Sequence, residues 1–208
     1  EFSVEAVLNS PMVADPLRLF MICATSDGAA AAVLTSLETA RRHTAKPVVV
    51  AGVGLGSSIY GDPTLRLSFL SAPSRGEAPL VSESAAACKQ AYQMAGAGPQ
   101  DMDLVELPDN SSWHYLQYIE TLGLCEPGGA DRMLDEGRTQ LGVKTPVNPS
   151  GGVASFGEAV TAQGLVQICE LVWQLRGQCG ARQVEGARIG LAQTYGQQGN
   201  SGTAILKV

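Results

Sequence analysis

Strand-like and helix-like segments alternate along this 208-residue sequence, and that alternation limits the possible fold more than any other feature. Apolar runs predict strands at 29–36, 47–53, 104–107, 189–194 and 203–208. Helices are predicted at 37–43, 82–95, 113–122 and 158–176, and Ser111 or Ser112 can cap the third of them. Residues 59–79 predict an exposed loop, and residues 126–146 predict a polar connection. The expected fold class is therefore α/β, with helices on the faces of a sheet.

The composition predicts a protein that contacts a partner. Hydrophobic residues make up 45% of the chain and charged residues only 16%, which is apolar for a free monomer. The net charge of -6 argues against binding to nucleic acid or to an anionic membrane. No apolar run of about 20 residues is present, so no membrane span is expected. Five cysteines without paired spacing are expected to be reduced core thiols of a cytoplasmic protein: Cys23, Cys88, Cys125, Cys169 and Cys179.

A glycine-rich segment runs from Asn148 to Gly164, with the letters NPSGGVASFGEAVTAQG, and leads into the last predicted helix. Its glycines permit a tight loop with close backbone approach, and a helix that follows points free N–H groups at such a loop. The segment resembles the active-site loop of the thiolase superfamily, in the sterol-carrier-protein-x type. In that type a Gly-His-Pro motif stands where this chain has Gly157, Glu158 and Ala159.

The resemblance covers essentially the whole chain. Residues 10–19 and 26–34 resemble the segment that forms the last strand of a thiolase N-terminal half, and residues 104–110 and 188–208 resemble two C-terminal motifs. Pro108 and Thr194 stand at two positions that carry thiolase chemistry, and Thr194 replaces an acid/base cysteine. The resemblance implies a thiolase-like layered fold, with a mixed five-stranded sheet covered by helices. It also implies that residues 1–45 are the end of an N-terminal half and that residues 46–208 are the thiolase-like C-terminal domain.

The same resemblance implies an acyl-CoA protein of lipid or steroid metabolism. Because Glu158 replaces the histidine and the half that would hold the nucleophilic cysteine is not in the chain, classical thiolysis is not expected. The implied chemistry is cleavage or formation of a carbon–carbon bond of the aldolase kind, by an enzyme that works within a larger assembly. The alternative is a catalytically silent thiolase-fold subunit that serves as a scaffold or binds a partner.

Seven residues are expected to form the site under this resemblance. Glu158 and Asp109 would handle protons, and Tyr195 and His114 are candidate donors. Gly157, Gly196 and Cys23 would contact the coenzyme A thioester, with backbone N–H groups of the Gly196 loop as an oxyanion hole. Each catalytic candidate also has a structural interpretation: Glu158 as a solvated first-turn residue, His114 as part of an aromatic packing face, and Asp109 and Tyr195 as structural neighbours.

A coenzyme A thioester is the expected substrate, and neither a covalently bound cofactor nor a metal is expected. The partial dinucleotide motif at 52–56 is interpreted as a strand-end turn, because it lacks the third glycine of the usual spacing. The expected protein partners are a thiolase N-terminal half or a second thiolase-like chain, and in addition a small zinc-ribbon or OB-fold protein. A dimer is expected, and binding to nucleic acid or a membrane is not.

Overall fold

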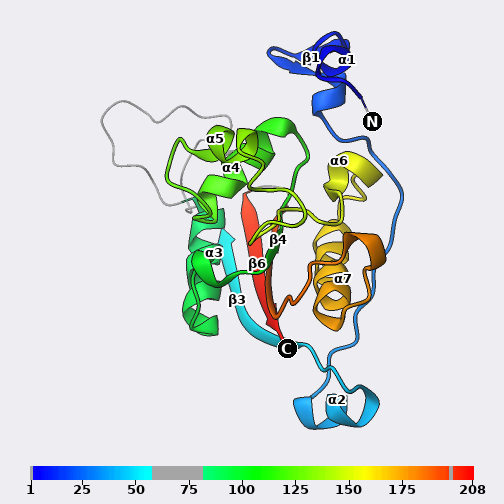
Figure 1. Cartoon of the computed structure of the whole chain (residues 1–208), viewed down its shortest axis with the longest axis vertical. Helices are drawn as coiled ribbons and strands as arrows, with labels where there is room; N and C mark the ends of the chain where they lie inside the picture. The colour runs from blue at the N-terminus through cyan, green and yellow to red at the C-terminus, as the bar shows by residue number, and fades with distance from the viewer. Residues whose placement is uncertain (1, 58–81, 197–198) are drawn as a thin grey trace.

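The structure is a computed structural model that describes residues 2–57, 82–196 and 199–208 (Figure 1). The loop predicted at 59–79 lies outside the described residues. A layered α/β body forms most of the molecule, and a small hairpin near the N-terminus lies beyond one end of its sheet (Figure 1).

One mixed sheet lies at the centre of the described body. Its strands are β3 (Val49–Ser57), β4 (Leu104–Glu106), β5 (Ile189–Gly196) and β6 (Asn200–Lys207), in the order β3-β6-β5-β4. Strand β6 runs antiparallel to both of its neighbours, whereas β4 and β5 are parallel. On the other side of β4, Val147 forms an isolated parallel bridge with Val105. Four strands and this bridge therefore stand where five strands were expected.

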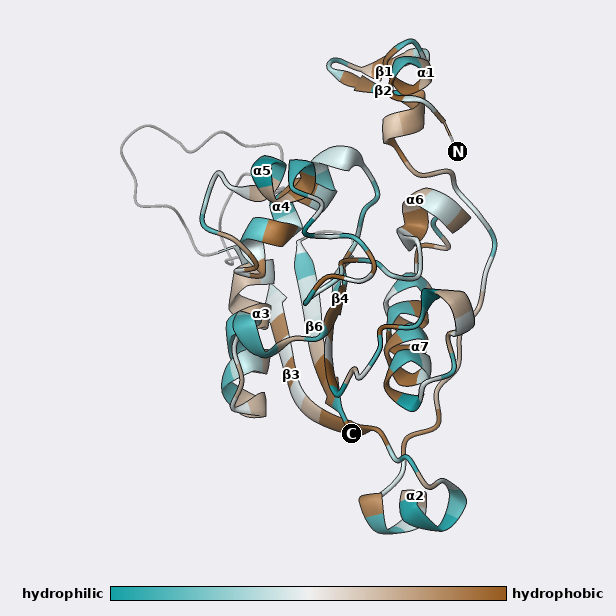
Figure 2. Ribbon diagram, viewed as in Figure 1, coloured by the Kyte–Doolittle hydropathy of each residue, from teal (hydrophilic) through white to brown (hydrophobic). Residues whose placement is uncertain are grey.

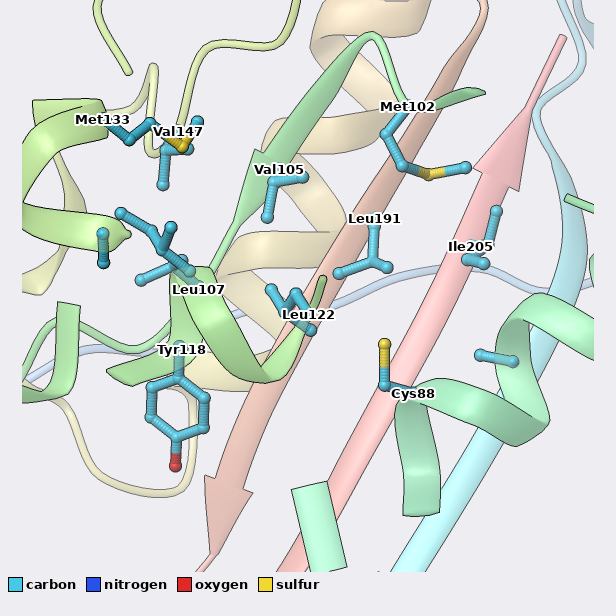
Figure 3. Close-up of a cluster of buried hydrophobic side chains, with 13 residues drawn as sticks. Cys88, Met102, Val105, Leu107, Tyr118, Leu122, Met133, Val147, Leu191 and Ile205 are labelled. Atoms are coloured by element: carbon cyan, nitrogen blue, oxygen red, sulfur yellow. The ribbon is translucent and has the colours of Figure 1, made fainter. Parts of the chain in front are cut away.

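Helices cover both faces of the sheet (Figure 1). Helix α3 (Glu83–Ala95) and helix α4 (Ser112–Thr121) pack on one face, and α7 (Gln163–Arg176) packs on the other. The larger apolar cluster lies on the α3 side, where Figure 3 shows Cys88 near Leu191 and Ile205, and Tyr118 near Leu107. Each large side chain buried in this way contributes about 1.5–3 kcal/mol of hydrophobic free energy.

Local caps explain where the helices begin and end. The Ser82 hydroxyl accepts a hydrogen bond from the Ala85 N–H at 3.2 Å at the start of α3, and Gly96 ends that helix with a φ of +63°. Ser111 caps α4, and Ser36 caps α2 (Leu37–His43) through their hydroxyl groups. The helices predicted at 37–43, 82–95 and 113–122 are therefore confirmed. Inside the predicted polar connection the structure adds a short helix, α5 (Ala130–Asp135).

The glycines at 52–56 lie inside strand β3, so the predicted strand-end turn is wrong. A Cβ atom placed on Gly52 would lie 2.3 Å from the Ala91 carbonyl oxygen, and one placed on Gly54 would lie 1.8 Å from that of Ala87. Both distances are far below van der Waals contact. The glycines therefore allow the backbone of α3 to approach the sheet closely.

The N-terminal region lies outside the main sheet. Helix α1 (Val4–Leu8) precedes a hairpin of β1 (Met12–Ala14) and β2 (Leu17–Arg18), and a 3-10 turn (Leu19–Met21) follows it. Figure 2 shows apolar colouring on the β1–β2 hairpin, where Val13 is 58% exposed.

Elsewhere in the described chain, further 3-10 turns are Pro99–Asp101 and Gly180–Arg182.

The strand predicted at 29–36 does not form. Residues 22–36, the connecting segment, run in an irregular path past α6 (Gly152–Phe156) and α7 (Figure 1). A strand requires a neighbouring strand to complete its hydrogen bonds, and none of the described strands lies beside residues 29–36. Val33 and Leu34 are consequently 96% and 80% exposed. The division into residues 1–45 and 46–208 stays a prediction, with the first strand of the main sheet beginning at Val49.

Among the described helices, none is both long and apolar enough to cross a lipid bilayer.

Candidate functional site

The predicted site residues cluster at the end of the sheet where the parallel strands β4 and β5 finish. The loop 107–111 follows β4, the turn that joins β5 to β6 follows β5, and α6 lies close to both the loop and the start of α7 (Figure 1). In open α/β sheets, ligands bind at the carboxyl ends of parallel strands. This end of the sheet is therefore the candidate functional site.

The glycine-rich segment is bound to strand β4 by Asn148. The backbone N–H of Asn148 donates to the Val105 carbonyl at 2.7 Å. Its side-chain oxygen accepts from the Leu107 N–H at 2.8 Å, and its side-chain amide donates to the Leu107 carbonyl at 3.1 Å. These bonds hold Asn148 at a φ of +51°, which non-glycine residues seldom adopt.

A buried carboxyl group, Glu106, holds the next part of the segment. Glu106 is 2% exposed, and its two oxygens accept hydrogen bonds from the Ser150 N–H at 3.1 Å and the Ser150 hydroxyl at 2.7 Å. Burial raises the pKa of Glu106 to about 8, although the bonds from Ser150 act in the opposite direction. The carboxyl group is therefore mostly protonated at neutral pH.

Asp109, a predicted catalytic residue, serves as a cap for α6. Its Oδ1 accepts a hydrogen bond from the Val153 N–H at 2.8 Å. A Cβ atom on Gly152 would lie 2.1 Å from the other carboxylate oxygen, so only glycine fits there. Burial raises the pKa of Asp109, and hydrogen bonds from the backbone of Val153 and Ala154 oppose that rise. This environment matches the structural interpretation of Asp109.

Glu158 does not begin a helix, because α6 and α7 are separate. Gly157 ends α6 with a φ of +86°, and α7 begins only at Gln163. The backbone of Glu158 forms a parallel bridge with Thr25 of the connecting segment: its N–H donates to Ala24 at 2.7 Å, and its carbonyl accepts from Ser26 at 3.0 Å. The interpretation of Glu158 as a first-turn helix residue is therefore wrong.

Cys23 lies beside the Glu158 carboxylate. Its thiol donates a weak hydrogen bond to Glu158 Oε2, with 3.7 Å between the two atoms. Burial and then the Glu158 charge raise the pKa of Cys23 to about 11. The backbone N–H of Cys23 donates to Asn110 at 2.9 Å, so the connecting segment joins the β4 loop to Glu158. A thiol in this state is a hydrogen-bond donor and a poor nucleophile.

The structure separates Tyr195 from α7. Side chains alternate along β5: Leu191 packs in the cluster on the α3 side and Ala192 in the cluster on the α7 side. Tyr195 accordingly packs on the α3 side. Thr194 faces the start of α7, because a Cβ atom on Gly164 would lie 3.1 Å from the Thr194 methyl group.

His114 and Gly196 occupy other positions around the same end of the sheet. His114 Nδ1 lies 2.8 Å from the Ser111 hydroxyl, and its ring stacks on Tyr118 with 6.3 Å between the ring centroids. Burial lowers the pKa of His114, which favours the neutral ring. Gly196 faces the Asn200 side chain across the hairpin, and a Cβ atom placed on Gly196 would lie 1.9 Å from Asn200 Oδ1. Their predicted roles as proton donor and thioester contact stay predictions.

Sequence reasoning did not assign roles to Glu106, Asn148 or Ser150. One signal was present: Glu106 interrupts the apolar run of Leu104, Val105 and Leu107, and a charged residue in a buried strand is unusual. Among the described residues, no group of His, Cys, Asp and Glu could hold a metal ion. A shallow groove of about 590 Å³ lies beside the carboxyl end of α3, where Cys88, Tyr92 and Gly123 line it, and Glu158 is not among its lining residues.

Comparisons with known proteins agree with the sequence resemblance. Residues 71–207 match the family model described as thiolase C-terminal domain-like. An acetyl-CoA acetyltransferase of Methanothermobacter thermautotrophicus is 40% identical over 99% of this chain and 51% of its own length. A sterol carrier protein 2 of Rattus norvegicus is 37% identical over 96% of this chain and 36% of its own length.

A solved structure supports the same fold. The whole chain superposes on 51% of a chain of the Ltp2-ChsH2(DUF35) aldolase, with a TM-score of 0.81 and 24% sequence identity. The expected thiolase-like α/β fold is therefore confirmed. The chain spans about half or less of the length of these relatives. Because the family model covers about two thirds of the sequence, the chain belongs to the thiolase C-terminal domain-like family.

Proposed function

We propose that this chain is the C-terminal half of an acyl-CoA enzyme of lipid metabolism that makes or breaks a carbon–carbon bond without a cysteine nucleophile. The observation that carries the proposal is the pair of Glu158 and Cys23. A partly buried carboxylate lies 3.7 Å from a thiol whose pKa is about 11, so in this pair the carboxylate is the proton acceptor. Glu158 lies in the segment that resembles the thiolase active-site loop, and Cys23 reaches it from the connecting segment.

A retro-aldol cleavage fits these groups. The Glu158 carboxylate would take the proton of a β-hydroxyl group on an acyl-CoA thioester. The bond between Cα and Cβ would then break, giving a carbonyl product, and its electron pair would move onto the thioester as an enolate. Protonation of the enolate at Cα by the same carboxyl group would balance the reaction. Backbone N–H groups of the Gly196 loop would stabilise the enolate oxygen, and the backbone of Gly157 would contact the thioester.

The experiment replaces Glu158 by Gln and measures cleavage of 3-hydroxyacyl-CoA thioesters, on this chain alone and together with a thiolase N-terminal half. Gln keeps the shape of the side chain but cannot take a proton, so the rate should fall roughly 100-fold or more while the fold is retained. Glu185→Gln is the matched control, because Glu185 is exposed and lies outside the site. Equal rates for wild type and Glu158→Gln would reject the catalytic role.

A second candidate is a silent thiolase-fold subunit. It is favoured by Asp109, which is occupied as the cap of α6, and by Tyr195, which packs on the face of the sheet away from α7. In that case acyl-CoA thioesters would produce neither turnover nor a shift in thermal unfolding, with or without the N-terminal half.

Either function would need a partner chain. Val33 and Leu34 are 96% and 80% exposed. We propose that a thiolase N-terminal half or a second thiolase-like chain buries them in a dimeric assembly. The name of the similar aldolase joins Ltp2 to a second component, ChsH2(DUF35), and a small protein of the zinc-ribbon or OB-fold kind is a further candidate partner for this chain. Replacing Val33 by Asp should weaken assembly in light scattering. A compact monomer with every candidate partner would contradict this part of the proposal.

A further inference from the structure

The end of β4 and the loop that follows it hold the glycine-rich segment through hydrogen bonds at positions 106, 107 and 109. The carboxyl group of Glu106 binds Ser150, the backbone of Leu107 binds the side chain of Asn148, and the carboxylate of Asp109 binds the N–H of Val153. All of these contacts join positions more than 40 residues apart in the sequence. The segment is thus placed by strand β4, which is itself a rigid part of the sheet.

Glu106, like Asp109, is an acidic group buried without a cation, but both of its oxygens contact a single residue of the segment. It is 2% exposed, and within the described chain it forms no ion pair. Both of its oxygens are instead used on one residue, Ser150. Burying a carboxyl group is costly unless its hydrogen bonds are made, so Ser150 has one strongly preferred position above the end of β4.

The position of Ser150 is passed on to Glu158 through a short chain of contacts. The Ser150 hydroxyl also accepts a hydrogen bond from the Gly152 N–H at 3.0 Å, and Gly152 is the first residue of α6. Helix α6 has only five residues, and Gly157 ends it immediately before Glu158. Only this short helix separates Ser150 from Glu158, so we expect a shift at Ser150 to disturb Glu158, although hydrogen bonds to Ala24 and Ser26 also hold the Glu158 backbone.

We propose that Glu106 is a positioning residue, which sets the place of the Glu158 carboxylate through Ser150 and α6. The effect of Glu106 on a reaction rate rests on the proposed function. The binding of Ser150 by Glu106 is independent of that function, because it can be measured without any substrate.

The test compares Glu106→Gln, Glu106→Ala and Ser150→Ala by amide hydrogen exchange in peptides that span residues 147–158. Gln can accept from the Ser150 N–H and donate to its hydroxyl, so exchange in Glu106→Gln should stay at the wild-type rate. Glu106→Ala and Ser150→Ala each remove two of these hydrogen bonds, and losing one buried hydrogen bond typically costs about tenfold, so both should exchange about tenfold or more faster in these peptides, with α3 unchanged. Ser155→Ala is the matched control, because Ser155 is exposed on α6 and its hydroxyl makes none of the described hydrogen bonds. If Glu106→Ala fails to fold, Ser150→Ala still tests whether the contact with Glu106 holds the segment, because it removes a single hydroxyl group.

The catalytic consequence is measured on the same variants with 3-hydroxyacyl-CoA. The expected result is a kcat about tenfold lower in Ser150→Ala, with KM nearly unchanged and with wild-type kcat in Glu106→Gln. Wild-type exchange in both Glu106→Ala and Ser150→Ala would overturn the hold on the segment. Faster exchange with an unchanged kcat would overturn the positioning of Glu158. If the wild type turns over no acyl-CoA, the proposed function fails, and the exchange data alone decide whether Glu106 holds the segment.

Discussion

Replacing Gly54 by Ala should destabilise the fold severely, although it adds only one methyl group. The added Cβ would lie 1.8 Å from the Ala87 carbonyl oxygen and 3.0 Å from the Ala91 nitrogen. Ordinary contact begins at 3.4 Å, so α3 would have to move away by roughly 1.6 Å, the difference between the two distances. Backbone atoms of a helix cannot give way as the end of a side chain can.

The magnitude follows from how α3 packs on the sheet. Cβ atoms placed on Gly52 and Gly56 would also lie within 2.3 Å and 2.0 Å of the α3 backbone, so α3 packs closely on β3 along its length and cannot avoid the Gly54 methyl group by tilting. Lifting it opens the apolar cluster around Cys88 and Ala91. The cost should be about 3 kcal/mol or more, at or above the upper end of the usual range for overpacking. Native domains are stable by only about 5–15 kcal/mol, so this is a large fraction of the total.

Urea unfolding, followed by circular dichroism, measures this effect. With a slope of about 2 kcal/mol per molar urea, the midpoint for Gly54→Ala should fall by about 1.5 M. Gly202→Ala is the matched control, because Gly202 also lies in a strand but its added Cβ would make ordinary contacts at 3.6 Å. That variant should unfold within about 1 kcal/mol of wild type. Equal midpoints for the two variants would refute the close-packing argument.

Three further predictions concern individual polar groups. The pKa of Glu106 is about 8 in the fold, above its ordinary value of 4.5, so the folded state binds the extra proton and the free energy of unfolding should fall as the pH rises from about 4.5 to about 8. Glu106→Gln should flatten that slope in urea titrations at several pH values, and an unchanged slope would contradict the raised pKa. Ser111→Ala removes the cap of α4 and should cost about 1 kcal/mol in thermal unfolding, and no loss would show that the cap is dispensable. Iodoacetamide at pH 8 should alkylate Cys23 about 100-fold more slowly than an unshifted thiol, because its pKa is about 11 rather than 9.0. Mass spectrometry measures the rate in the folded and the unfolded protein, and equal rates would contradict the raised pKa.

Local chemistry explains the parts of the fold that could be predicted. Ser82 and Gly96 bound α3, and Ser111 begins α4, through contacts within a few residues along the chain. The hairpin of β5 and β6 likewise joins segments that are adjacent in sequence. Such features depend on neighbouring residues alone, so a sequence pattern is enough to find them.

The errors have a common cause in longer-range contacts. Residues 29–36 have the composition of a strand, but no described strand lies beside them, so they remain irregular. The helix predicted at 158–176 begins at Gln163 instead, because Gly157 adopts a positive φ and Glu158 pairs with the distant Thr25. In both cases the backbone partner decides the structure, and the local composition does not.

The amino-acid sequence was enough to identify the family, the α/β class and the segment that carries Glu158, because glycines and a substituted motif are visible without coordinates. Which side chains meet in that segment depends on the tertiary structure. The fold places Cys23 beside Glu158, uses Asp109 as a helix cap, and turns Tyr195 to the other face of the sheet. These contacts join residues far apart in the chain, and they exist only after the strands of the sheet have paired in one register.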